Sequence, residues 1–108
     1  MTENLDTALK ERVRSVLNRE PVTEADLRRL VEEGHACVLI LRARLAGTEV
    51  RLAELAADPA GSLAETATTF RAVVDVRADV EELETLLEAL EVHARQARAT
   101  WLSSTGAR

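Results

Sequence analysis

The chain has few of the residue types that build active sites and covalent cross-links. Cys37 is the one cysteine among 108 residues, so no disulfide can form within the chain, and we expect a reducing compartment, the cytoplasm. Two histidines and no tyrosine leave few groups for acid–base chemistry, and neither a glycine-rich phosphate loop nor a Ser–His–Asp pattern is present. We therefore expect no enzymatic activity, no catalytic residue and no cofactor.

Positive charge and long apolar runs are also scarce. The 14 basic and 19 acidic residues give a net charge of −5, which argues against partners that need clustered cations, namely nucleic acid and anionic membranes. The longest unbroken apolar run, residues 36–41, is far too short to span a bilayer. Residues 1–6 include acids and no apolar stretch, so we expect no secretory signal.

What the sequence does contain is long stretches of good helix formers, separated at two prolines. Pro21 and Pro59 each stand between helical patterns, Thr23 is placed as an N-cap, and Ser62 with Glu65 has the spacing of a capping box. The sequence therefore predicts a single all-α domain over residues 1–108. The expected helices are 3–19, 24–57 and 63–103, followed by a flexible tail, 104–108.

Apolar residues recur at alternating steps of three and four in both long segments, which is the spacing of a coiled-coil seam. The short turn between the segments predicts an antiparallel helical hairpin, in a register that places Leu45 opposite Val76 and Gly34 opposite Leu87. Seam residues expected in the second helix are Leu27, Val31, Gly34, Val38, Leu41, Leu45, Thr48, Leu52 and Leu55. Those expected in the third are Thr66, Thr69, Val73, Val76, Val80, Leu83, Leu87, Leu90, Ala94, Ala97 and Trp101.

Between residues 36 and 50 the second helix is apolar on nearly all faces. A two-helix hairpin buries one stripe per helix, so the remaining apolar surface needs another cover. We expect two hairpins to pack through their second helices into a homodimeric bundle; the alternative is a monomer whose first helix folds over this stretch. Trp101 would lie beyond the second helix, and the first helix is the candidate to cover it. The residues predicted to lie in an interface are Ala36, Leu39, Ile40, Ala43, Ala46, Gly47, Val50 and Trp101.

Gly34 and Gly47 both fall inside the second helix, where each costs about 1 kcal/mol relative to alanine. Close packing against a partner helix or ligand would account for them, and so would simple tolerance. For Gly34, a small break in the helix is a further alternative.

Metal binding is the chemistry that the sequence comes nearest to. His35 and Cys37 point to different faces of a helix, and Glu32 with His35 has the Glu-x-x-His spacing of di-iron bundles without a second such motif. The segment 31–37, with Leu41 beyond it, resembles the segment around the first metal-ligating cysteine of copper-sensing repressors, which are also helical hairpins. That family needs a histidine and a second cysteine further along the helix, and residues 48–58 contain neither. We therefore expect no metal site.

The sequence as a whole favours a non-enzymatic helical scaffold or adaptor, which self-associates and presents a helical surface to a protein partner. The alternative is a small regulator, similar in role to an antitoxin or an anti-sigma factor, whose apolar stretch sequesters a different protein. DNA binding through a helix-turn-helix at residues 23–30 is favoured by Arg28 and Arg29 but opposed by the acidic surroundings. The many acids of the third helix suit a basic partner or, more simply, a solvated face.

Overall fold

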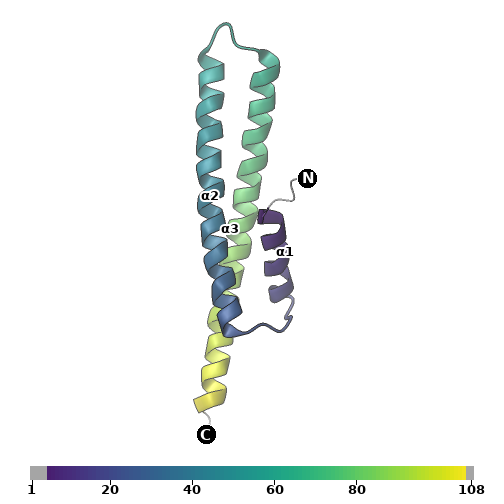
Figure 1. Ribbon diagram of the computed structural model, residues 1–108, viewed down its shortest axis with the longest axis vertical. Coiled ribbons are helices and arrows are strands. Elements are labelled where there is room, and N and C mark those ends of the chain that lie inside the picture. The colour runs from purple at the N-terminus through teal and green to yellow at the C-terminus, as the bar shows by residue number, and fades with distance from the viewer. Residues whose placement is uncertain (1–4, 107–108) are drawn as a thin grey trace. The chain divides into compact units, whose positions relative to one another are not determined.

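The structure, a computed structural model, describes residues 5–106 and, of these, the side chains from residue 7 to residue 103. This part of the chain contains three α-helices and no strand (Figure 1): α1 (Leu5–Leu17), α2 (Glu24–Ala57) and α3 (Leu63–Gly106). The all-α fold and the hairpin of α2 and α3 are confirmed. The described residues form two compact units: the first runs up to Cys37 and resumes at Leu83, and the second is Val38–Glu82.

Helices α2 and α3 begin at the residues that the sequence predicts, directly after their capping residues. The Thr23 side-chain oxygen accepts a hydrogen bond of 3.0 Å from the Asp26 backbone N–H, which satisfies one of the free donors at the start of α2. The Ser62 hydroxyl oxygen does the same for the Glu65 N–H at 3.2 Å. The carboxylate of Glu65 accepts a bond of 2.7 Å from Arg51, so this side chain links α3 to α2.

The first helix ends two residues earlier than the predicted residue 19, because Arg19 takes up a left-handed conformation with φ of 69°. The Glu20 N–H donates to the Ser15 carbonyl at 3.3 Å and the Arg19 N–H donates to the Val16 carbonyl at 3.0 Å. These two bonds are the pair that defines a Schellman motif, which closes a helix with one left-handed residue. Residues 3 and 4 of the predicted helix lie outside the described residues.

The third helix continues through Gly106, three residues beyond its predicted end at residue 103. The stretch after Leu102 contains serines and a threonine but no proline. Serine and threonine cost less than about 0.7 kcal/mol each inside a helix, so nothing stops the backbone before its glycine. Residues 107 and 108 lie outside the described residues.

The first unit is a packing of three helix segments around a common core. Figure 1 shows α1 lying alongside α2 and α3 in this unit, and an ion pair of 2.8 Å between Arg12 and Glu33 joins α1 to α2. Leu30 is buried although it stands off the seam, because the flank that it shares with Glu33 faces α1. The buried apolar side chains of this unit are Leu9, Val13, Val16, Leu27, Leu30, Leu83, Leu87 and Leu90.

The register of the hairpin in this unit is the predicted one. A Cβ atom added at Gly34 would lie 2.7 Å from Cδ1 of Leu87, so the glycine stands directly opposite that leucine. Gly34 is therefore explained by close packing within the chain, and α2 passes through it without a break.

The second unit is a two-helix hairpin with a narrower core. Its buried apolar side chains are Val38, Leu41, Leu55, Val73 and Val80. Two ion pairs flank this seam, Arg77 with Glu49 at 2.8 Å on one side and Arg51 with Glu65 at 2.7 Å on the other. Each helix here buries one stripe, which leaves the opposite side of each helix in solvent.

Candidate functional site

Six apolar or small residues of α2 in the second unit stand opposite the seam and form one continuous stripe. We call this stripe the α2 outer face: Leu39, Ile40, Ala43, Ala46, Gly47 and Val50. All six are exposed, and the three large side chains are left 66%, 60% and 58% exposed, respectively, by the described part of the chain. Large aliphatic side chains are more often buried in a globular protein, and a contiguous exposed row of them is typical of surfaces that bind another molecule.

The heptad pattern explains why these residues share one side. They fall at steps of three and four from one another, offset from the seam by half a helical turn, so they lie together on the side away from α3. No charged residue interrupts the stripe. The outward positions of α3 differ, because Arg71, Asp75 and Glu81 are among the residues found there. Large apolar side chains are also exposed on α3 in this unit, namely Leu63, Phe70 and Val74, but charged residues stand among them. What sets α2 apart is that its exposed apolar stripe has no charged residue within it.

Gly47 stands in the middle of the α2 outer face, and no neighbouring atom of the described residues requires a glycine there. A Cβ atom added there would meet no other atom within 4 Å. At Gly34, by contrast, the added Cβ atom would lie only 2.7 Å from Cδ1 of Leu87. Packing within the described residues therefore does not account for Gly47, which costs about 1 kcal/mol relative to alanine in a helix; close approach of a partner and simple tolerance both remain as explanations.

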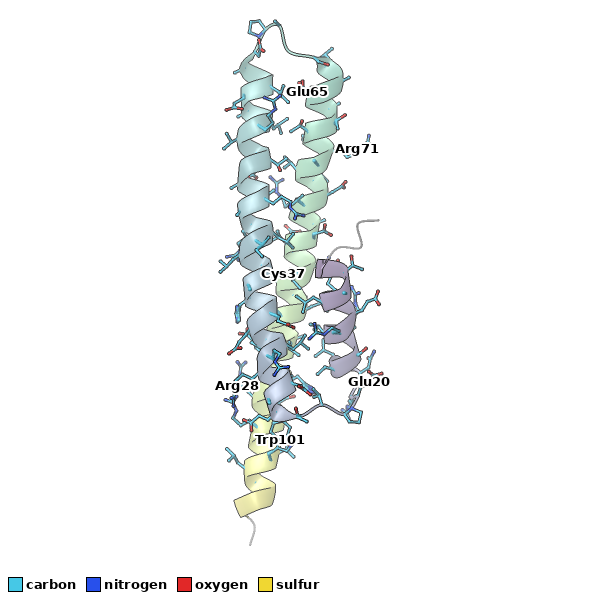
Figure 2. All side chains as sticks on the ribbon, in the orientation of Figure 1. Glu20, Arg28, Cys37, Glu65, Arg71 and Trp101 are labelled. Atoms are coloured by element: carbon cyan, nitrogen blue, oxygen red, sulfur yellow. The ribbon has the colours of Figure 1, made fainter. Side chains whose placement is uncertain are left out.

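Two of the predicted interface residues do not lie on the α2 outer face. Ala36 is exposed and belongs to the first unit, as does Trp101. Figure 2 shows Trp101 on the last turns of α3 and Arg28 on the first turns of α2, and both side chains line a hollow of the first unit. Trp101 is 36% exposed, and no residue of α1 lines this hollow.

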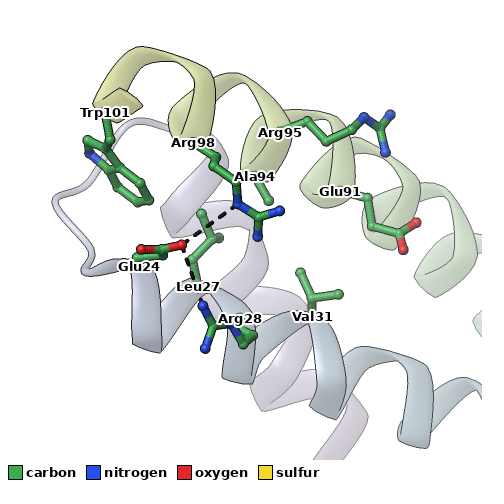
Figure 3. A pocket seen from close by; sticks show the side chains of 9 residues that line it. All are labelled: Glu24, Leu27, Arg28, Val31, Glu91, Ala94, Arg95, Arg98 and Trp101. Carbon is green, nitrogen blue, oxygen red and sulfur yellow. Dashed lines mark hydrogen bonds and ion pairs between the residues drawn. The ribbon is translucent and has the colours of Figure 1, made fainter. Parts of the chain in front are cut away.

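The hollow has a volume of about 200 Å³ and lies between the first turns of α2 and the last turns of α3 (Figure 3). It exists because the seam of α3 changes from leucines to Ala94 at the point where it faces Leu27, so that the side chains no longer fill the space. Its residues are Glu24, Leu27, Arg28, Val31, Glu91, Ala94, Arg95, Arg98 and Trp101. The seam change is visible in the sequence, but the arginines around it cannot be placed without the structure.

The residues considered for metal binding are dispersed. His35 is 2.8 Å from the Glu91 carboxylate, and Cys37 is a half-buried thiol that forms no disulfide. No group of three or more histidine, cysteine, aspartate or glutamate side chains is close enough to hold a metal ion within the described residues. A single His–Glu pair supplies too few ligands for the metal sites that proteins ordinarily build.

Comparison of the chain with protein-family models, with curated proteins and with solved structures gives no match. Within residues 5–106, no helix combines the length and the apolarity that a bilayer crossing requires.

Proposed function

We propose that this protein is a non-enzymatic helical scaffold or adaptor, which self-associates through the α2 outer face and presents a helical surface to protein partners. The observation that carries the proposal is the α2 outer face, whose six residues are all exposed and uncharged. Burying such a row against a second copy recovers the hydrophobic free energy that the isolated hairpin leaves unused.

The order of side-chain sizes along the α2 outer face suits pairing with itself. Leu39 and Ile40 are large, Ala43, Ala46 and Gly47 are small, and Val50 is larger again. When two copies of α2 pack in opposite directions about a twofold axis, Leu39 and Ile40 of one copy face Val50 of the other. The small residues in the middle of each stripe then face one another. The two backbones then approach closely at Gly47, and this close approach would explain why a glycine stands there.

The free energy at stake can be estimated from the exposed side chains. Full burial of a leucine or isoleucine is worth about 1.5–3 kcal/mol, and Leu39 and Ile40 are about two-thirds exposed, so each contributes about 1–2 kcal/mol. Two copies bring four such side chains, or about 4–8 kcal/mol. The double substitution Leu39→Asp with Ile40→Asp should therefore weaken the dimer about a thousandfold or more.

The experiment is light scattering coupled to gel filtration at micromolar concentration, with circular dichroism to monitor helicity. The wild-type chain should elute with the mass of two copies, and the double aspartate variant should elute as a helical monomer. Leu102→Asp is the matched control, because Leu102 is 67% exposed on α3 and lies outside the α2 outer face; this variant should remain dimeric.

A wild-type chain that is monomeric throughout the micromolar range would refute self-association. If the isolated chain is instead loosely folded or aggregated, and recovers one stoichiometric protein partner that restores its structure, the α2 outer face serves sequestration of a different protein. In that case the double aspartate variant should no longer recover the partner, and a variant that still recovers it would show that the partner binds elsewhere.

A further inference from the structure

The hollow in the first unit combines an apolar floor with a basic rim. Leu27, Ala94 and Trp101 supply apolar surface, and Arg95 and Arg98 also line the hollow. Figure 3 shows the Arg98 guanidinium beside Leu27, whereas that of Arg95 points away from Trp101 along α3. None of these residues belongs to the α2 outer face. An apolar recess bordered by cations calls for an occupant that has an apolar group next to negative charge.

The charges around the hollow leave positive charge available. Three arginines face two glutamates there, and both glutamates already have partners: Glu24 lies 3.5 Å from Arg28 and 3.7 Å from Arg98, and Glu91 lies 2.8 Å from His35. Arg95 has no ion-pair partner among the described residues.

Both ion pairs of Glu24 are longer than a charge-assisted hydrogen bond, whose usual length is about 2.7–2.9 Å. A carboxylate from outside could therefore approach Arg95 directly and take over Arg98 in better geometry. This excess of cations is local, since the chain as a whole carries a net charge of −5.

The size of the hollow decides between a small molecule and a side chain. Its volume of about 200 Å³ exceeds the roughly 150 Å³ that accepts a benzene ring, but it falls below the roughly 300–1,000 Å³ of pockets for drug-sized ligands. One leucine or phenyl side chain fills it. The remainder of the occupant must then lie outside the hollow, over the arginines.

We propose that this hollow is a docking site for an acidic segment of a partner protein. One apolar side chain of the segment inserts between Leu27, Ala94 and Trp101, and neighbouring carboxylates pair with Arg95 and Arg98. The site goes beyond self-association, because it gives the protein a second surface of different chemistry.

Trp101 makes the test direct, since it is the one tryptophan of the chain and its fluorescence reports the hollow alone. The probe is a capped octapeptide of alternating glutamate and leucine, added to the full-length protein. Binding should shift the emission to shorter wavelength as the ring loses water, with a dissociation constant that rises with salt. Replacing the glutamates by glutamines, or the leucines by alanines, should each weaken binding about tenfold.

Variants of the protein locate the effect. Arg95→Glu should weaken binding about five- to tenfold, since it removes one attraction and adds one repulsion. Arg71→Glu is the matched control, because it makes the same change of charge at an exposed α3 position of the second unit, and it should leave binding unchanged. Ala94→Leu should fill the hollow and abolish the shift while circular dichroism shows the helices intact.

Three results would overturn the proposal: no emission change up to millimolar peptide, equal weakening by Arg71→Glu and Arg95→Glu, or an equal shift with sodium phosphate at matched ionic strength. The last would show an anion site without preference for a peptide. The double aspartate variant of the α2 outer face should bind the peptide as wild type does, so this proposal and self-association fail independently.

Discussion

The two helical glycines of α2 give a matched pair of substitutions whose effects should have opposite signs. Gly34→Ala and Gly47→Ala add the same methyl group to the same helix, and both gain about 1 kcal/mol from helix propensity. They differ in what the methyl group meets. At Gly34 it would lie 2.7 Å from Cδ1 of Leu87, and at Gly47 it would meet nothing within 4 Å.

The magnitude follows from that contact. Carbon atoms pack best at about 3.5–4.0 Å, so the Leu87 side chain must shift by about 1 Å. Leu87 is 5% exposed, and overpacking a core costs about 1–3 kcal/mol. We expect Gly34→Ala to lower the free energy of unfolding by about 0–2 kcal/mol and Gly47→Ala to raise it by about 1 kcal/mol. The two variants should therefore differ by about 1–3 kcal/mol.

The assay is urea unfolding followed by circular dichroism, with both substitutions made in the double aspartate variant so that self-association does not contribute. At about 4–8 °C per kcal/mol for a chain of this size, the same difference should also appear in the melting temperature. Equal stabilisation by the two alanines would show that Leu87 does not press on Gly34, and the register would then need revision. In the wild-type background, the gain at Gly47 should shrink or reverse as dimerisation weakens.

Four further predictions concern the helix ends, the core and metals. Arg19→Gly should raise the free energy of unfolding by about 0.5–1 kcal/mol in urea, because Arg19 holds a φ of 69° that glycine adopts without steric cost. Thr23→Ala should lower it by about 1 kcal/mol, since the Asp26 N–H loses its acceptor, whereas Thr23→Ser should be nearly neutral. Leu83→Ala should cost about 2–5 kcal/mol, because Leu83 is fully buried, and a smaller loss would mean that the core collapses around the cavity. Adding zinc or a chelator should leave the melting temperature of the wild type unchanged; a rise with zinc would contradict the expectation that the chain binds no metal.

Much of the fold could be predicted because local signals and the heptad pattern agree. Thr23 and Ser62 act as caps where the sequence places them, so α2 and α3 begin at the expected residues. The seam pattern sets the register, which the contact of Gly34 with Leu87 confirms. The end of α1 was missed, since a left-handed arginine carries no sequence signal comparable to glycine.

The candidate sites could be predicted only in part. The apolar residues of the α2 outer face follow from periodicity, because the side opposite the seam is fixed once the seam is known. Sequence alone left Gly34 and Gly47 undecided, since the difference between them depends on where a leucine methyl group lies. The hollow also escaped prediction, because its rim joins residues from the first turns of α2 and the last turns of α3.

The ion pair between Glu49 and Arg77 helps to select the register in which α2 pairs with α3. Arg42 and Glu49 stand one heptad apart on α2, and Arg77 and Glu84 stand one heptad apart on the matching flank of α3. Sliding one helix by seven residues would set Arg77 against Arg42 in one direction and Glu84 against Glu49 in the other. Either shift would still place most seam residues opposite seam residues, but it would bring side chains of like charge together. The charged flank therefore disfavours shifted registers that the core alone would tolerate.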